Sequence, residues 1–303
     1  MIIGDLDTTA VLKRLKSPGL HFQAGQFSVN LRSEITRVAT NIRQMYWDAP
    51  LVEGDFADFH IEMRHSRGIR RFYHPQVSFH LNGHAPFAPL PVKQAYALTE
   101  WGLNWCISKH FQECLLIHAA VLEKEGLALI LPGTPGSGKS TLCAALVAKG
   151  GWRVLSDELT LIDCRTGQVI PNPRPISLKN QSIPVFQRFC PEAIFSDLAR
   201  DTLKGTVAHV RPPRDSIERL NEPATPRFIV FPKFVPQAAT ELGEAPEGVS
   251  FLELANQSFN YSILGDQGFL TLSQLLTQCR CYYFEYGGNF DEAIRVFNGL
   301  VRP

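Results

Sequence analysis

The feature that most constrains this chain is a glycine-rich loop between an apolar run and a helical segment. Residues 133–140 read Gly-Thr-Pro-Gly-Ser-Gly-Lys-Ser and match the pattern G-x-x-x-x-G-K-[ST]. This segment, called the phosphate loop below, follows the apolar run 127–131, which is typical of a strand buried on both faces. A helix is expected over residues 141–149. The order of strand, glycine loop and helix predicts a phosphate-binding α/β unit.

The residue types of the phosphate loop suit the binding of a nucleotide. Glycines let consecutive main-chain N–H groups curl around phosphates, and the positive end of the helix dipole points to the same place. Lys139 is expected to reach the β- and γ-phosphates, and the Ser140 hydroxyl to bind Mg²⁺. The predicted nucleotide-binding residues are Gly133, Thr134, Pro135, Gly136, Ser137, Gly138, Lys139, Ser140 and Thr141.

An acidic pair follows the phosphate loop after one helix and one turn. Asp157 and Glu158 come after the predicted strand 152–155, with Asp157 eighteen residues beyond Lys139. Ligands of such sheets gather at the carboxyl ends of strands, so we expect the pair close to the loop. One acid can hold Mg²⁺, and the other can align a hydroxyl and accept its proton. A solvated turn with two routine acids is the alternative.

Missing motifs narrow the class of nucleotide-binding protein. The sequence has no Asn-Lys-x-Asp, which disfavours a guanine-specific GTPase, and no Leu-Ser-Gly-Gly-Gln, which disfavours a transporter ATPase. It offers no clear distant acid or arginine finger of the kind that motor and remodelling ATPases use. A phosphotransferase that places its own acid beside an acceptor remains.

Composition and charge indicate a soluble cytoplasmic protein. The 303 residues carry 30 basic and 29 acidic side chains without a basic block, which argues against nucleic-acid and membrane partners. No stretch approaches the roughly 18 apolar residues of a membrane span, and acids near the start argue against a secretory signal. The 7 scattered cysteines fit a reducing compartment, and Cys279 with Cys281 alone makes a poor metal site.

Residues 1–112 are expected to form a smaller, β-rich α+β unit that ends in a long helix. The Asn82-Gly83 pair predicts a turn between alternating residues. Strands are predicted over 20–34, as a hairpin around Gly25, and over 56–63, 70–73 and 77–81, with helices over 34–47 and 92–111. The buried positions expected on the last helix are Ala95, Leu98, Trp101, Leu103, Trp105 and Ile107.

Residues 113–303 are expected to form the main domain around the phosphate loop. One strand is predicted over 115–122, turning at Glu125-Gly126 into the strand 127–131. Further strands are predicted over 152–155, 160–162, 228–231 and 281–286, and a terminal helix over 290–301. The fold class is therefore α/β, of the α+β kind with a mixed sheet.

Four of these segments together resemble the HPr serine kinase/phosphorylase family: 117–121, 126–131, 133–140 and 154–158. That family has a histidine-led strand pair, a phosphate loop and an acidic pair one helix later. This resemblance covers about residues 115–165. The stretches 173–179, 204–213 and 230–233 extend a likeness to the HprK-related kinase A proteins over most of the chain. The resemblance implies a fold akin to phosphoenolpyruvate carboxykinase, antiparallel strands 117–122 and 127–131, and a homo-oligomer.

The resemblance also implies roles for single residues. Asp157 would be the base that activates the acceptor hydroxyl, and His118 would support it from the neighbouring strand. Glu158 stands where the family has a second aspartate, and it would still bind Mg²⁺ together with Ser140. Because the family's later dephosphorylation motif is missing, we expect a kinase only. Without the resemblance, His118 is more typical of a core histidine.

Two further groups of residues are candidate contacts for phosphate or acceptor. Arg174 and Lys179 flank a proline-rich turn, where cations could neutralise the transferring phosphoryl group or simply lie at the surface. Lys204, His209 and Arg211 share a segment bounded by glycine and proline. We expect this segment to be a loop that closes over nucleotide or acceptor, and a solvated connection is the alternative.

The function predicted from the sequence is an ATP- and Mg²⁺-dependent kinase with Asp157 as base. Its acceptor would be a hydroxyl, either a serine of a protein or peptide or a small molecule. One alternative is a regulatory ATP-binding module that hydrolyses ATP slowly or not at all. Another is an adenylate-kinase-like metabolite kinase, which predicts a purely parallel sheet and a mobile helical lid.

Overall fold

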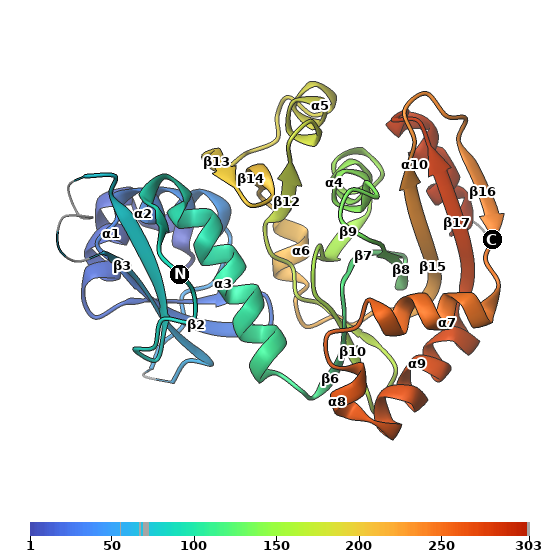
Figure 1. Cartoon of the computed structure of the whole chain (residues 1–303), viewed down its shortest axis with the longest axis horizontal. Coiled ribbons are helices and arrows are strands. Elements are labelled where there is room, and N and C mark those ends of the chain that lie inside the picture. Colours follow the sequence, from blue (N-terminus) through green and yellow to red (C-terminus); the bar gives the residue numbers. More distant parts are fainter. Residues whose placement is uncertain (55, 67, 69–72, 302–303) are drawn as a thin grey trace.

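The computed structural model describes residues 1–54, 56–66, 68 and 73–301. Figure 1 shows an N-terminal half built on one sheet, at the left, and a larger half at the right, with helix α3 (Ala95–His110) leading from one to the other. The predicted mixture of helices and strands is confirmed. The strand predicted over 70–73 lies outside the described residues except for Tyr73.

The N-terminal half is a five-stranded sheet with helices packed on it. Its strand order is β1-β2-β3-β4-β5; β2 and β3 are parallel, and the other neighbours are antiparallel. The predicted hairpin turns at Gly25, where φ is +64°. The elements before α3 are η1 (Ile3–Asp5), α1 (Thr8–Lys16), β1 (Leu20–Ala24), β2 (Phe27–Ser33), α2 (Thr36–Met45), β3 (Phe59–His65), β4 (Gln76–Leu81), β5 (Leu90–Pro91) and η3 (Val92–Gln94).

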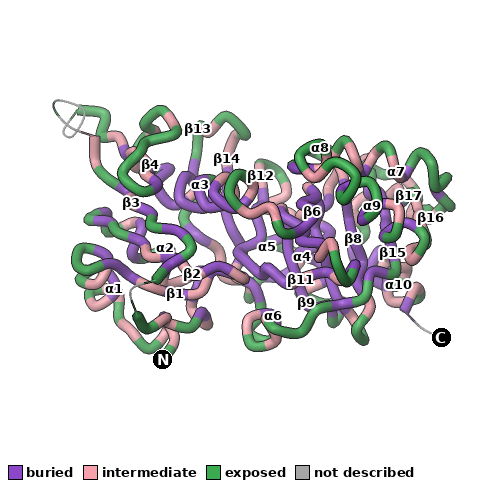
Figure 2. Tube along the Cα trace, turned by 90° about the horizontal axis from the view of Figure 1, so that it is seen from below, coloured by how far each residue is buried: buried purple, intermediate pink, exposed green. Residues whose placement is uncertain are grey.

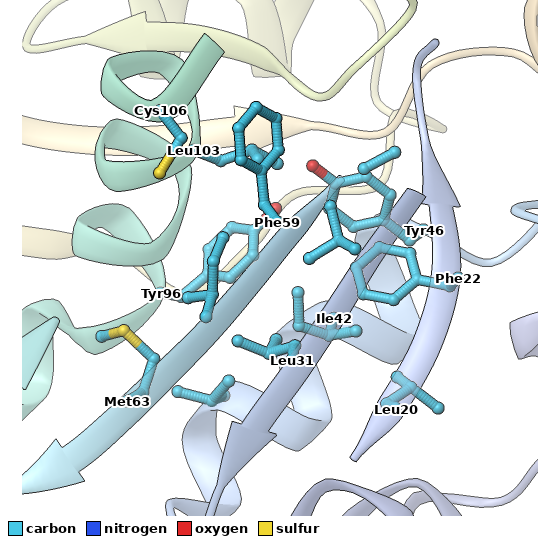
Figure 3. Close-up of a cluster of buried hydrophobic side chains, with 14 of the residues drawn as sticks. Leu20, Phe22, Leu31, Ile42, Tyr46, Phe59, Met63, Tyr96, Leu103 and Cys106 are labelled. Atoms are coloured by element: carbon cyan, nitrogen blue, oxygen red, sulfur yellow. The ribbon is translucent and has the colours of Figure 1, made fainter. Parts of the chain in front are cut away.

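Alternation along these strands builds the first core. Every second residue of β1, β2 and β4 is buried, as expected when one sheet face is covered. Figure 3 shows Phe22 and Leu31 of the sheet near Ile42 of α2, and Leu103 of α3 beside Phe59 of β3. The same cluster extends to Leu116, Leu159 and Leu161, so apolar contacts join the two halves. The boundary predicted between residues 112 and 113 stays a prediction.

A mixed six-stranded sheet organises the second half. Its order is β16-β17-β15-β8-β7-β9, with β8, β15 and β17 parallel and with β7 antiparallel to both neighbours. The predicted antiparallel pairing is confirmed between β7 and β8, and it differs from the purely parallel sheet of the adenylate-kinase-like alternative. The strands are β7 (Ala119–Lys124), β8 (Leu127–Pro132), β9 (Arg153–Ser156), β15 (Thr225–Phe234), β16 (Glu241–Glu244) and β17 (Arg280–Tyr286).

Helices cover both faces of this sheet. Leu129 and Leu131 of β8 pack toward α4 (Lys139–Lys149) and α10 (Phe290–Leu300). Ala128 and Ile130 point to the other face, which is covered by α7 (Glu247–Asn256) and α9 (Asp266–Gln278). Figure 2 shows the central strands buried and the outlying helices and turns more exposed. The continuous apolar run of β8 therefore serves two cores, as its sequence predicts.

Two small antiparallel sheets complete the described part of the chain. Their orders are β11-β10-β6 and β12-β14-β13. The strands are β6 (Cys114–Ile117), β10 (Thr160–Asp163), β11 (Val169–Ile170), β12 (Ile176–Lys179), β13 (Ala199–Thr202) and β14 (Gly205–Val210). The remaining helices are α5 (Ser182–Phe189), α6 (Arg214–Glu218) and α8 (Tyr261–Leu264). In the described ranges, no helix combines the length and apolar character that a membrane span needs.

Three local predictions are wrong. The single strand over 115–122 is two strands in different sheets, because the chain passes from β6 to β7 at His118. The loop predicted around His209 is mostly strand β14, because it pairs with β12 over four residues. Trp101 is 44% exposed rather than buried. Its ring stacks on the ring of Phe87, with the two centroids 4.2 Å apart. Trp101 therefore packs against the connector that precedes α3 and not into the core.

Candidate functional site

Sheet topology brings the candidate residues to one edge. Strand β7 lies between β8 and β9 and runs antiparallel to both. The amino end of β7 therefore lies beside the carboxyl ends of its two neighbours. The phosphate loop follows β8, Asp157 and Glu158 follow β9, and His118 precedes β7. One edge of the sheet thus collects all three features, as open α/β sheets do for their ligands.

The glycines of the phosphate loop have backbone conformations that favour glycine. Gly136 has φ +93° and Gly138 has φ +90°. A Cβ atom at Gly138 would clash with the Tyr286 hydroxyl, whereas a Cβ atom at Gly136 would meet open space. The Tyr286 hydroxyl donates a hydrogen bond to the Gly138 carbonyl at 3.1 Å. The end of β17 thus fixes the last turn of the loop.

The phosphate loop ends at the amino end of α4. The first hydrogen bond of this helix runs from Leu142 N to the Gly138 carbonyl at 2.9 Å. The N–H groups of Lys139, Ser140 and Thr141 therefore precede the helical ladder and point out of its end. With the positive end of the helix dipole they form a site suited to phosphate oxygens.

Lys139 lies buried between the loop and His118. Its Nζ donates to the Gly133 carbonyl at 3.0 Å and to His118 Nε2 at 3.2 Å. Burial and the Lys139 charge lower the pKa of His118 to about 4, so the ring is neutral and accepts this hydrogen bond. His118 Nε2 is therefore paired with the lysine and not with Asp157, the partner that the resemblance implies.

Asp157 is buried with half of its carboxylate paired. Oδ2 accepts a hydrogen bond from Ser177 N at 2.8 Å. Oδ1 is also buried, and no described residue donates to it. Burial, together with the charge of Glu158, raises the pKa of Asp157 to about 6. Asp157 also lies near enough to Lys139 for its charge to raise the pKa of that lysine, although burial lowers this pKa overall.

Glu158 is held from both sides. Its Oε2 accepts a hydrogen bond from Asn104 Nδ2 at 2.5 Å, and its Oε1 lies 3.5 Å from Lys179 Nζ. Burial opposes ionisation, but the charges of Lys179 and Lys204 outweigh it and hold the pKa of Glu158 down to about 2. Glu158 is therefore a fixed anion, whereas its neighbour Asp157 titrates close to neutral pH.

Arg174 belongs to a buried hydrogen-bond network, and its described side-chain partners lie outside the phosphate loop. Its Nη2 lies 2.7 Å from Glu100 Oε2, and its Nη1 donates to Asn104 Oδ1 at 2.6 Å. Tyr46 Oη donates to the same Glu100 oxygen at 3.1 Å. Tyr46, Glu100 and Asn104 are not among the site residues predicted from the sequence. Nothing in their local sequence marks them, because the packing of α2 and α3 brings them to the site.

The other three candidates do not gather. Lys204 is exposed in the turn between β13 and β14. Its positive charge nevertheless contributes to lowering the pKa of Lys139 and of Glu158. The Arg211 guanidinium lies over the Trp47 ring, 5.8 Å from its centroid. His209 is buried on β14. Of the three, only His209 lines the recess described next.

A recess opens beside Asp157, between α3 and the carboxyl end of β9. The space inside it is about 20 Å³, room for little more than a water molecule, and about 320 Å³ when the open space at its mouth is included. Its wall combines acidic, basic and amide side chains from both halves of the chain. The lining residues are Glu100, Asn104, Ser156, Asp157, Glu158, Leu159, Asn172, Arg174, Pro175, Ser177 and His209.

The acids fit Mg²⁺ only together with a bound phosphate. In the described ranges, no three His, Cys, Asp or Glu side chains are grouped to hold a metal ion by themselves. Mg²⁺ usually takes one or two carboxylates and completes its shell with phosphate oxygens and water. The Ser140 hydroxyl and the Glu158 carboxylate, which stays ionised, offer such a partial set.

One comparison with known proteins gives a match. Residues 101–178 are similar to the family described as SynChlorMet cassette protein ScmC. This stretch is about a quarter of the 303-residue chain. It begins within α3 and ends within β12, so it includes Asn104, the phosphate loop and both acids and stops before Lys179. The curated proteins contain no match to this chain.

Proposed function

We propose that the protein is an ATP- and Mg²⁺-dependent kinase, similar to HPr kinases, that phosphorylates a hydroxyl. The observation that carries this proposal is the state of Asp157. Its buried Oδ1 has no donor among the described residues, and it lies at the same sheet edge as the phosphate loop. A buried carboxylate with a free oxygen beside such a loop is suited to accept a proton from an attacking hydroxyl.

The residues divide the reaction between them. The N–H groups at the start of α4 and the Lys139 ammonium bind the β- and γ-phosphates. Asp157 Oδ1 orients the acceptor hydroxyl and takes its proton while the hydroxyl oxygen attacks the γ-phosphorus in line. The bond between the γ-phosphorus and the bridging oxygen breaks, and ADP leaves with that oxygen. Mg²⁺, held by Ser140 and Glu158, would neutralise charge on the β- and γ-phosphates.

The acid–base properties of the two carboxylates support this division. Burial and the Glu158 charge raise the pKa of Asp157 to about 6, which suits a general base working near neutral pH. Glu158 keeps its charge to much lower pH, which suits a metal ligand. Environments that separate two neighbouring carboxyl groups in this way are typical of acid–base sites.

The fold also favours this proposal over the second alternative. The antiparallel β7–β8 pair leads directly into the phosphate loop, as the resemblance to HPr kinases implies. An adenylate-kinase-like enzyme would have a purely parallel sheet, whereas β7 and β16 run antiparallel to their neighbours here.

The test is transfer of label from [γ-³²P]ATP to the proteins and metabolites of a lysate from the source cells. Asp157→Asn should abolish transfer and leave ATP affinity within about threefold, because the amide keeps the shape but cannot take the proton. Asp215→Asn makes the same change on the exposed helix α6 and should have no effect. Equal transfer by wild type and Asp157→Asn would reject the base. ATP binding without transfer by the wild type would favour the regulatory module.

A further inference from the structure

An exposed apolar surface covers three consecutive helices of the second half. It is formed by side chains of α7, α8 and α9 and of the turn between α7 and α8, and it is called the α7–α9 face below. Leu252, Ile263 and Leu270 are 63%, 69% and 64% exposed. The other exposed large apolar side chains of the face are Val249, Phe259 and Phe269.

The α7–α9 face is one surface, because its three helices pack around a shared aromatic cluster. The centroid of the Phe251 ring on α7 lies 5.5 Å from that of Phe269 on α9 and 6.2 Å from that of Tyr261 on α8. Gly268 lets α8 approach α9, since a Cβ atom there would come within 2.7 Å of the Tyr261 carbonyl oxygen. Figure 1 and Figure 2 both show the three helices together at the outside of the molecule. Apolar surface that is contiguous over several elements marks an interaction site.

The segment that builds this face carries charge of one sign. Residues 234–279 contain no lysine, arginine or histidine. Glu247 and Asp266, which open α7 and α9, are exposed. The acids of the segment are Glu241, Glu244, Glu247, Glu253 and Asp266. None of them forms an ion pair with a described residue, so their charge is available to a partner.

We propose that the α7–α9 face binds a partner protein through an amphipathic helix whose apolar stripe is bordered by lysines and arginines. The stripe covers the exposed apolar side chains, and the cations meet Glu247 and Asp266. The same negative charge disfavours other occupants. It repels an anionic membrane or a nucleic acid, and two copies of this chain placed face to face would set these acids against each other.

The helical construction of the face favours a helical partner over an extended one. Helices α7 and α9 satisfy their own main-chain groups except at their ends, so the surface offers side chains and no sheet edge. An extended segment would leave its N–H and C=O groups without partners across this apolar surface. A helix satisfies these groups internally and presents only side chains.

The face reaches the candidate functional site at Phe259. The ring of this residue lies edge-on to the His118 ring, with centroids 5.9 Å apart. The His118 N–H donates to the Gln257 carbonyl at 2.7 Å, and His118 Nε2 is paired with Lys139. A partner on the face therefore docks next to the phosphate loop. The proposal does not rest on the kinase function.

A peptide titration tests the chemistry of the partner. The probe is a fluorescent helical peptide of about five turns with a leucine stripe and with lysines elsewhere. One control peptide has glutamates in place of the lysines, and the other has the residues of the probe in scrambled order. We expect the probe to bind at least about tenfold more tightly than either control, and added salt to weaken its binding. Equal affinity for the probe and either control overturns the proposal.

Matched variants test whether the probe binds on this face. Ile263→Ser combined with Leu270→Ser should weaken binding at least about tenfold. Leu203→Ser, which removes a fully exposed leucine from the turn between β13 and β14, should have no effect. Circular dichroism and thermal unfolding check that the variants are folded. Glu247→Gln combined with Asp266→Asn should also weaken binding and reduce its salt dependence. Unchanged affinity in both double variants overturns the assignment of the face.

Photo-crosslinking in the source cells tests the natural partner. Ile263→p-benzoylphenylalanine places the crosslinker on the face, and Leu203→p-benzoylphenylalanine is the control. We expect a protein crosslinked from position 263 and not from position 203, attached through a segment of apolar and basic residues. A second copy of this chain, a lipid or an acidic segment at position 263 overturns the proposal. The absence of any crosslink specific to position 263 also overturns it.

Discussion

Asn104 on helix α3 donates a hydrogen bond of 2.5 Å to Glu158 at the end of β9. The orientation of its amide is set by Arg174, whose Nη1 donates to the Asn104 oxygen at 2.6 Å. The helix that closes the N-terminal half therefore holds one of the two site acids. The N-terminal half contributes directly to the site, and its packing on the second half is expected to matter for activity.

Loss of this hydrogen bond should reduce turnover more than nucleotide binding. Asn104→Leu leaves Glu158 without its amide donor and Arg174 Nη1 without its acceptor. We expect kcat to fall about tenfold, with ATP affinity changed less than about threefold. Steady-state kinetics and nucleotide titration measure the two effects. Lys109→Ala, exposed in the last turn of the same helix, is the control. Unchanged kcat in Asn104→Leu would show that Glu158 needs no support from α3.

The buried pair of Glu100 and Arg174 should be important for stability. Glu100→Gln removes the charge that compensates a buried guanidinium 2.7 Å away. Breaking one side of such a pair costs about 3–5 kcal/mol, and we expect a loss of this order in the free energy of unfolding by urea. Arg174→Met combined with Glu100→Gln should recover part of the loss. A loss below about 1 kcal/mol in the single variant would contradict this account.

Activity should depend on pH through Asp157. The base must be deprotonated, and burial with the Glu158 charge raises its pKa from 3.8 to about 6. The value of kcat/KM should therefore rise from about pH 5, pass its midpoint near pH 6 and level off above about pH 7. Rate measurements across this range at saturating Mg²⁺ test the expectation. A flat profile would mean that no group titrating near pH 6 takes the proton.

Two glycines of the phosphate loop should respond differently to alanine. Gly136 and Gly138 have nearly the same φ, +93° and +90°. Gly136→Ala adds backbone strain alone, of about 1 kcal/mol, because its Cβ meets open space. Gly138→Ala adds the same strain and a clash with the Tyr286 hydroxyl. We expect ATP affinity to fall at least about tenfold further in Gly138→Ala, and Tyr286→Phe to recover part of it. Equal affinities would contradict the observed packing of the loop.

The residues of this site that belong to short sequence motifs could be predicted. The residues that only tertiary packing brings to the site could not. The phosphate loop is a contiguous motif between a strand and a helix, and Asp157 follows the next strand, so neighbouring residues suffice to find both. Asn104 and Glu100 have no such signal, because only the packing of α3 against the second half gives them a partner. The sequence predicts a loop around His209, whereas this residue lies on β14, because β14 pairs with the distant strand β12.

The sequence of helix α3 explains why Trp101 is predicted to be buried although it is 44% exposed. Apolar residues occur all around this helix, so its sequence does not define a single buried face. Trp101 belongs to the apolar set but is on the outer side, where Phe87 from the preceding connector covers its ring. The strand break at His118 has a similar origin. The chain is apolar on both sides of it, and only pairing with two different sheets separates β6 from β7.

The most direct test of the central claim is a crystal structure with Mg²⁺ and a non-hydrolysable ATP analogue. We expect the β- and γ-phosphates to lie against the N–H groups of residues 138–141 and beside Lys139. We also expect room for one hydroxyl oxygen about 3 Å from both the γ-phosphorus and Asp157 Oδ1. A triphosphate bound elsewhere, or a γ-phosphate turned away from Asp157, would contradict it.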